Sequence, residues 1–192
     1  MKHVASIFTI LFFLTACKTT FHQNAGSFYI ANNLKSKLIP LHKFQGDVTI
    51  SNIMESNYKN SSYTANSIVK ISKEEMKVIA LSDISRIFTI SFKGGKIDSE
   101  FSVLVPAKDV APHYILSDIQ MIYFPESAIA SSLPTEMKMV QSQFGEGIKR
   151  EFYCKNQKVI IITYSLADLF KSDIEFQNLE RSYSYKIKYI GD

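Results

Sequence analysis

Cysteine is scarce in this chain of 192 residues, with only two present, and tryptophan is absent. Long apolar runs are scarce too, since no segment after Leu14 is apolar for long enough to cross a bilayer as a helix. The formal charge of +4 is mild, whereas a nucleic-acid-binding protein needs a concentrated basic face. The chain is therefore predicted to form one domain with a real apolar core and to bind no nucleic acid.

Motifs that carry chemistry are also missing. The four histidines are scattered, and none has a cysteine, histidine or carboxylate at zinc-like spacing. The chain has no Gly-x-Ser-x-Gly elbow, phosphate-binding loop or dinucleotide fingerprint. We therefore expect a protein that is not an enzyme, with no catalytic residues, no metal site and no cofactor.

The first residues carry the strongest positive signal. Lys2 and His3 form a short basic start, and Val4 to Leu14 runs without a charge, as in the core of a signal peptide. The following Leu-Thr-Ala-Cys resembles the lipobox of bacterial lipoproteins, which implies cleavage before Cys17 and acylation of that residue, for example with palmitate. An ordinary signal peptide with a chance cysteine is the alternative.

Acylation has consequences for the rest of the chain. Two or three acyl chains anchor a protein firmly, because each buried CH₂ contributes about 0.8 kcal/mol. Cys154 is then the one remaining cysteine, so no internal disulfide is expected. Lys18 follows the anchor where an aspartate would favour inner-membrane retention, so the resemblance implies a periplasm-facing lipoprotein of the outer membrane. We predict a signal peptide over 1–16, an anchor and tether over 17–44, and a single domain over 45–192, with a short helix around Ser27 to Leu38.

From Gly46 onward, apolar and polar residues alternate at period two between turn residues, as in half-buried strands. Gly94-Gly95 predicts a tight hairpin, because glycine tolerates the positive φ of primed turns. Pro112 is well placed to begin a helix, and Pro125 ends it and opens a second. The first predicted helix begins at Pro112 and is stopped by Pro125, and the second runs from Glu126 to Leu133. The predicted strands are 47–54, 63–72, 76–83, 86–93, 96–105, 136–143, 148–155, 158–165, 173–179 and 183–190.

About ten strands with one helical insertion predict a mainly β fold with inserted helices. We expect a curved antiparallel sheet, or incomplete β-barrel, lidded by a helical pair. On the strand after the hairpin, Ile97, Phe101, Val103 and Val105 share one face, opposite Lys96, Asp98 and Glu100. The helices either pack into a solid core or cover a hollow concave side, and the sequence leaves both open.

Three stretches resemble a family of bacterial lipoproteins catalogued as of unknown function, often encoded beside aryl-polyene pigment biosynthesis. They are 77–95, 117–134 and 174–187, and the most specific pattern is Asp-x-Gln-x-x-Tyr-aromatic-Pro from Asp118 to Pro125. That family in turn resembles the lipoprotein receptor LolB and its periplasmic partner LolA, whose incomplete barrels receive acyl chains on a hydrophobic concave face. The resemblance implies a groove that binds a hydrophobic or acyl-bearing ligand, in lipoprotein or lipid/polyene transfer.

The expected partners are the outer membrane through Cys17, a hydrophobic or lipid ligand, and a periplasmic carrier protein. An excess of apolar and aromatic residues supports such a groove, because a lined apolar face suffices to hold an acyl chain. The alternative is a non-enzymatic scaffold or interaction lipoprotein of an envelope complex with a solid core. The candidate lining residues are Phe88, Ile90, Phe101, Val103, Ile119, Ile122, Phe176 and Tyr185.

Overall fold

The computed structural model describes residues 19–31, 33–58, 61–102 and 111–191. The predicted signal peptide, the predicted lipidation site Cys17 and the predicted lining residue Val103 lie outside these residues.

The main feature is an antiparallel sheet of eleven strands in the order β1-β8-β7-β6-β5-β4-β13-β12-β11-β10-β9. Two five-stranded meanders, β4 to β8 and β9 to β13, join through the pairing of β4 with β13, and β1 adds a strand beside β8. Within the part of the chain that the structure describes, β1 and β9 form two separate edges, so the sheet is not closed. The strands are β1 (Thr19–Asn24), β4 (Val48–Tyr58), β5 (Ser61–Ile71), β6 (Glu75–Leu81), β7 (Arg86–Lys93), β8 (Lys96–Phe101), β9 (Met137–Phe144), β10 (Gly147–Cys154), β11 (Gln157–Tyr164), β12 (Ile174–Asn178) and β13 (Tyr183–Tyr189).

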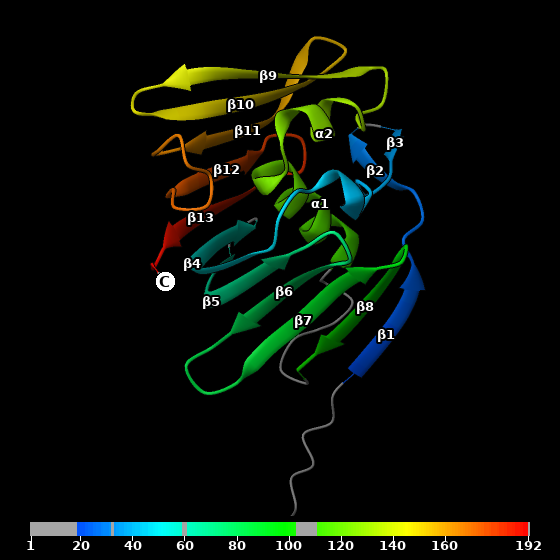
Figure 1. The fold of residues 1–192 in the computed structure, drawn as a ribbon, viewed down its shortest axis with the longest axis vertical. Coiled ribbons are helices and arrows are strands. Elements are labelled where there is room, and N and C mark those ends of the chain that lie inside the picture. The colour runs from blue at the N-terminus through cyan, green and yellow to red at the C-terminus, as the bar shows by residue number, and fades with distance from the viewer. Residues whose placement is uncertain (1–18, 32, 59–60, 103–110, 192) are drawn as a thin grey trace, which may run out of the picture.

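The sheet curves around two helices. In Figure 1 it passes from β9 and β10 at the top, through β13 and β4 at the left, to β8 and β1 at the bottom, and α1 and α2 lie inside the curve. The predicted fold class, a curved antiparallel sheet covered by a helical pair, is confirmed. The physical reason is alternation: along β8, Ile97 and Phe101 are buried, whereas Lys96 and Asp98 on the other face are exposed.

Both helices form where the positions of the prolines predict them. Helix α1 (Pro112–Tyr123) has its proline at the first helical position, where the missing N–H costs nothing. It ends at Phe124, because the residue before Pro125 is restricted to extended backbone. Helix α2 (Glu126–Ala130) is shorter than predicted. The hydroxyls of Ser131 and Ser132 both bond to the Ala128 carbonyl and compete with further helical turns.

The segment predicted to be a tether is instead part of the fold. Strand β1 pairs with β8 along its whole length, and β2 (Phe28–Ala31) forms a hairpin with β3 (Leu34–Ser36) where a helix was predicted. A short 3₁₀ helix, η1 (Leu41–Lys43), follows. The predicted domain boundary at residue 45 is therefore wrong, because apolar residues before it complete the core. These are Phe28, Ile30, Ala31, Leu38, Ile39, Leu41 and Phe44, all buried.

Two glycine-containing turns set the strand pairing. Gly94 and Gly95 both have positive φ, 56° and 76°, and form the two-residue β7–β8 hairpin that was predicted. Gly147 begins β10 and lies close to the main chain of Tyr164, the last residue of the neighbouring strand β11. A Cβ on Gly147 would lie 1.8 Å from the carbonyl oxygen of Tyr164, so this position admits no side chain without movement of the backbone.

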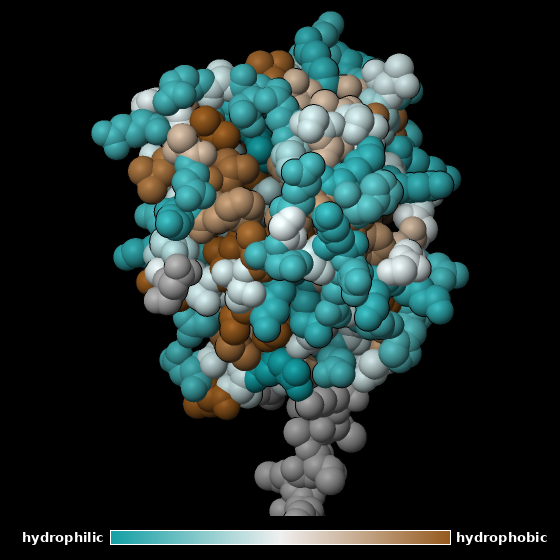
Figure 2. Space-filling view, viewed as in Figure 1, coloured by the Kyte–Doolittle hydropathy of each residue, from teal (hydrophilic) through white to brown (hydrophobic). Residues whose placement is uncertain are grey.

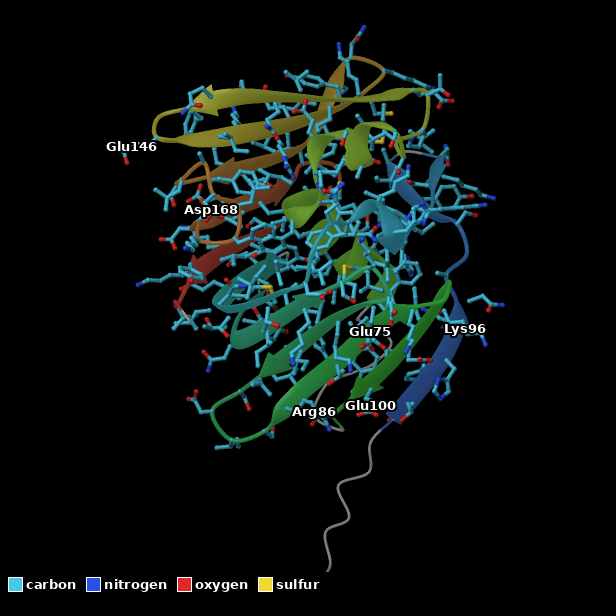
Figure 3. The ribbon with its side chains drawn as sticks, in the orientation of Figure 1. Glu75, Arg86, Lys96, Glu100, Glu146 and Asp168 are labelled. Carbon is cyan, nitrogen blue, oxygen red and sulfur yellow. The ribbon has the colours of Figure 1, made fainter. Side chains whose placement is uncertain are left out.

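Charged side chains lie on the rim and outer face of the sheet. Arg86 and Glu100, on neighbouring strands β7 and β8, form an ion pair at 3.6 Å, and both are partly exposed (Figure 3). Glu151 on β10 pairs with Lys149 at 2.9 Å and with Lys158 at 2.6 Å. Such exposed pairs contribute little stability, so the fold depends on the core inside the curve.

Candidate functional site on the concave face

The described residues of the predicted lining lie together in the core between the sheet and α1. Phe88, Ile90 and Phe101 project from β7 and β8, and α1 contacts both strands. Phe176 and Tyr185, on β12 and β13, pack ring to ring with centroids 5.3 Å apart. Tyr185 is partly buried and the others are buried, including Ile119 and Ile122 of α1. The structure thus brings these predicted residues to one side of the sheet.

Among the described residues this side is filled, not hollow. Eight consecutive residues of α1, from Leu116 to Tyr123, are buried, so this part of the helix is enclosed. Figure 2, viewed as Figure 1, shows mostly hydrophilic residues over the middle of the molecule, with hydrophobic residues gathered toward its left margin.

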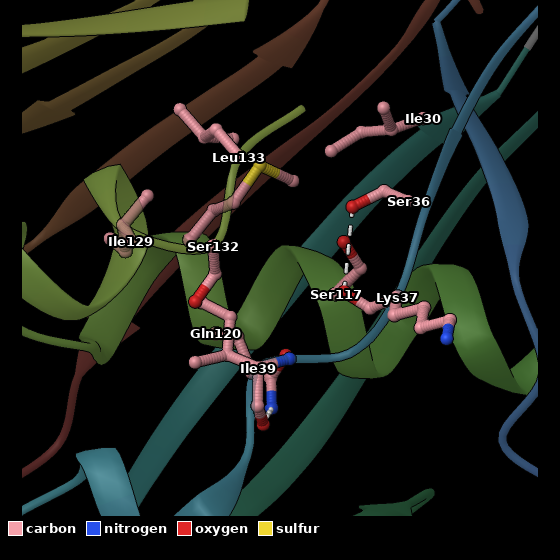
Figure 4. A pocket seen from close by; sticks show the side chains of 10 residues that line it. Ile30, Ser36, Lys37, Ile39, Ser117, Gln120, Ile129, Ser132 and Leu133 are labelled. Carbon is pink, nitrogen blue, oxygen red and sulfur yellow. Dashed lines mark hydrogen bonds between the residues drawn. The ribbon is translucent and has the colours of Figure 1, made fainter. Parts of the chain in front are cut away.

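A small cavity of about 20 Å³ remains beside α1, α2 and the β3–η1 segment (Figure 4). That volume has room for one water molecule, whereas ligand pockets usually measure roughly 300–1,000 Å³. Its lining consists of Ile30, Ser36, Lys37, Ile39, Ser117, Gln120, Met121, Ile129, Ser132 and Leu133.

The Asp-x-Gln-x-x-Tyr-aromatic-Pro pattern fixes α1 in this position. The Gln120 side chain donates to the Ile39 carbonyl at 2.8 Å and accepts from the Ile39 N–H at 2.7 Å, much as a neighbouring strand would. Tyr123 accepts a long hydrogen bond, 3.5 Å, from the amide of Asn52 on β4. The ring of the aromatic residue, Phe124, packs on Phe44 with centroids 5.2 Å apart. Each polar or aromatic position of the pattern thus contacts a different part of the fold.

The first position of the pattern, Asp118, places a carboxyl group inside the core. Its Oδ2 accepts hydrogen bonds from the hydroxyls of Tyr183 at 2.8 Å and Tyr185 at 3.2 Å. Burial raises the pKa of the Asp118 carboxyl to about 7, although both tyrosine hydroxyls and the charge of Arg181 act in the opposite direction. Burial also raises the pKa of Tyr183 and Tyr185, so both hydroxyls stay protonated and can donate.

The neighbours of this carboxylate hold the donors in place. Asn178 accepts from the Arg181 backbone N–H at 2.9 Å, so its amide nitrogen faces Tyr183 and donates to the hydroxyl oxygen at 3.2 Å. The Tyr183 hydroxyl proton must therefore point to Asp118. The Arg181 guanidinium lies 3.9 Å from the centre of the Tyr114 ring and donates to the Tyr29 carbonyl. Together these contacts connect the β12–β13 turn to β2 and to the start of α1.

The other end of α1 rests on a buried cation. Arg150 on β10, 2% exposed, donates to the carbonyls of Met121 and Ile122 at 2.9 and 3.0 Å, and to the Gln141 side chain at 2.9 Å. The Tyr164 hydroxyl also donates to Ile122, at 2.6 Å. The last carbonyls of a helix lack partners within it and carry partial negative charge, so a guanidinium there satisfies both needs.

Sequence analysis did not assign roles to these polar residues. Asp118, Gln120 and Tyr123 stand in the most specific pattern of the predicted resemblance, and that pattern was the available signal. Tyr183 was not among the predicted lining residues. Arg150 gave no signal, because a lysine or arginine in an alternating strand is usually on the solvent face.

An open antiparallel sheet wrapped around two helices defines the class, an incomplete β-barrel with its concave side covered. The chain belongs to the family described as "Protein of unknown function (DUF3261)", whose model matches residues 50–191. No curated protein matches it in sequence. It is similar to the crystal structure of a domain described as an outer membrane lipoprotein-sorting protein, from Vibrio parahaemolyticus, with a TM-score of 0.40 and 11% identity over 78% of this chain and 86% of that one. At that level of likeness the fold class rests on the strand order of this chain itself.

Two further properties concern the described residues. None of the helices they form is both long and apolar enough to cross a lipid bilayer. Over 19–31, 33–58, 61–102 and 111–191, no three histidine, cysteine, aspartate or glutamate side chains gather closely enough to hold a metal ion.

Proposed function

We propose that the chain is a non-enzymatic lipoprotein of the outer membrane, anchored through acyl chains on Cys17. Its concave face would receive a hydrophobic or acyl-bearing ligand when the lid, defined here as α1 and α2, moves off the sheet. The ligand would be the acyl chain of another lipoprotein or a lipid-linked polyene, delivered by a periplasmic carrier and moved without nucleotide hydrolysis.

The observation that carries the proposal is the enclosure of α1. A helix of 12 residues is about 18 Å long, and its last eight residues are buried on every side by the sheet, α2 and the segment from β2 to η1. It lies along the apolar face of the sheet as an elongated apolar ligand would. Removing α1 would expose Phe88, Ile90 and Phe176, which can cover an acyl chain instead, at roughly 25 cal/mol per Å² of apolar surface buried.

The polar contacts of α1 make such an exchange specific. Most of the side-chain hydrogen bonds that hold the lid run through Asp118, Gln120 and Arg150, and water can replace them when the helix moves out. Weakening one of them should therefore favour the open form and strengthen ligand binding, because ligand affinity scales with the population of the competent form.

The test uses mature chain 18–192, which contains every element of the described core, and a fluorescent fatty acid as the probe. We expect wild-type protein to bind the probe. Gln120→Ala, which removes the paired bonds to Ile39, should bind it about tenfold more tightly. Gln177→Ala, an exposed position on β12, is the matched control and should bind like wild type. Absence of probe binding in all three, with native circular dichroism spectra, would refute the proposal.

A second function is favoured by the filled concave side itself. The protein would then be an interaction lipoprotein of an envelope complex, with α1 a permanent part of the core. Its exposed edge strand β9, with Val140 44% and Phe144 55% exposed, offers a surface for a protein partner. In that case Gln120→Ala should lower the free energy of unfolding without any gain in probe binding.

A further inference from the structure

The contacts of Asp118 contain more than a means of holding α1. The carboxylate lies in a mainly apolar core, and its direct hydrogen-bond partners among the described residues are two tyrosine hydroxyls on the sheet. Both donors come from β13, which does not move with α1. If α1 leaves, Tyr183 and Tyr185 stay on the concave wall with their donors directed at a common point.

The surroundings of these donors suit a negatively charged oxygen. Asn178 fixes the Tyr183 hydroxyl as a donor, because the amide nitrogen occupies its lone pair at 3.2 Å. The guanidinium of Arg181, which donates to the Tyr29 carbonyl of β2, adds a positive charge near the same point. Phe176 stacks against both tyrosine rings, with centroids 5.9 and 5.3 Å away, and forms an apolar floor beside the donors. Convergent donors, one cation and an adjoining apolar surface form a site for the charged end of an amphipathic molecule.

We propose that Tyr183 and Tyr185, supported by Asn178 and Arg181, form a binding site for the carboxylate of a long-chain carboxylic acid, which Asp118 occupies while α1 lies on the sheet. The inference rests on the proposed function, because it needs the concave face to open. It adds the chemical class of the ligand, an apolar chain ending in a carboxylate. The apolar chain would lie along Phe176 and the strands that α1 now covers.

The site also explains why an aspartate stands at this position of α1. A buried carboxylate without a direct ion pair destabilises a core, and an apolar side chain would pack there at lower cost. As a substitute for the ligand, however, Asp118 keeps both hydroxyls satisfied in the closed form. The lid and the ligand then compete for the same two donors, so that binding of the acid and docking of α1 exclude each other.

The experiment compares two ligands of equal length, dodecanoate and dodecanol, as competitors of N-phenyl-1-naphthylamine bound to chain 18–192 at pH 8. Wild type should bind the acid about tenfold more tightly than the alcohol, since hydrogen bonds to a charged group are about twice as strong as neutral ones. Tyr183→Phe combined with Tyr185→Phe should abolish this preference, so that the variant binds the acid and the alcohol equally tightly. Tyr153→Phe, on the outer face of β10, is the matched control and should keep the preference.

A second variant covers the possibility that the double substitution disturbs folding. Asp118→Ala leaves both tyrosines in place and removes their competitor, so it should raise the affinities for dodecanoate and dodecanol alike, by about tenfold, and keep the preference for the acid. Equal affinity of wild type for acid and alcohol would overturn the carboxylate site and leave the proposed apolar groove standing. Binding of neither competitor nor dye would overturn the proposed function and the site together.

Discussion

Replacing Asp118 by asparagine should make the free energy of unfolding less sensitive to pH. The structure gives both the sign and the size of this change. Asparagine has nearly the same shape, and its side-chain oxygen can still accept from Tyr183 and Tyr185. The pKa of the aspartate is about 7 in the folded protein, against an ordinary value of 3.8 for this side chain. The folded state therefore binds a proton more tightly than the unfolded state, and this contribution to stability is fully present below pH 3.8. It is lost as the pH rises through 7.

A difference of about three pKa units corresponds to roughly 4 kcal/mol. Between pH 4 and pH 8 the wild type should thus lose up to about 4 kcal/mol of unfolding free energy relative to Asp118→Asn. Arg181, Tyr183, Tyr185 and the nearby His113, whose pKa burial lowers, face Asp118 or its neighbours. They are present in both proteins, so their own titration largely cancels in the difference.

The assay is urea unfolding of both proteins at steps between pH 4 and pH 8, with Asp83→Asn, the same change in the exposed β6–β7 turn, as the control. The difference for Asp118→Asn should rise with pH, and the difference for Asp83→Asn should stay flat. A difference for Asp118→Asn that does not change with pH would show that the carboxyl is not buried among these tyrosines.

Two further substitutions test how the lid and the sheet are held together. Arg150→Met should lower the free energy of unfolding by about 3 kcal/mol, since it leaves helix carbonyls at Met121 and Ile122 without their charged donor. The control, Lys149→Met on the outer face, should lower it by under about 1 kcal/mol in the same urea titration. Equal losses in the two variants would contradict the role of Arg150. Gly147→Ala should cost about 2 kcal/mol or more, because its Cβ meets the Tyr164 carbonyl. A thermal melt unchanged from wild type would disprove that close approach.

Much of the fold follows from local sequence patterns. Strand β7 has the predicted bounds, Arg86–Lys93, and α1 begins at Pro112 and ends before Pro125, as predicted. Alternation at period two and the positions of proline and glycine are short-range properties, so they can be found without knowledge of distant residues. The inward-facing positions of the predicted lining residues follow from the same patterns, since these residues lie on strands and a helix whose faces the sequence defines.

What the sequence by itself determined is therefore most of the elements after Gly46, their faces and the curved sheet with helices across it. Only the tertiary structure decided which distant segments meet: β1 with β8, β4 with β13, and the β2–η1 segment with α1. It also decided that the concave side is filled and that Asp118 and Arg150 are buried. Burial of a charged residue depends on partners far away in the chain, here Tyr183 for the carboxylate and the end of α1 for the guanidinium, and local patterns contain no record of them.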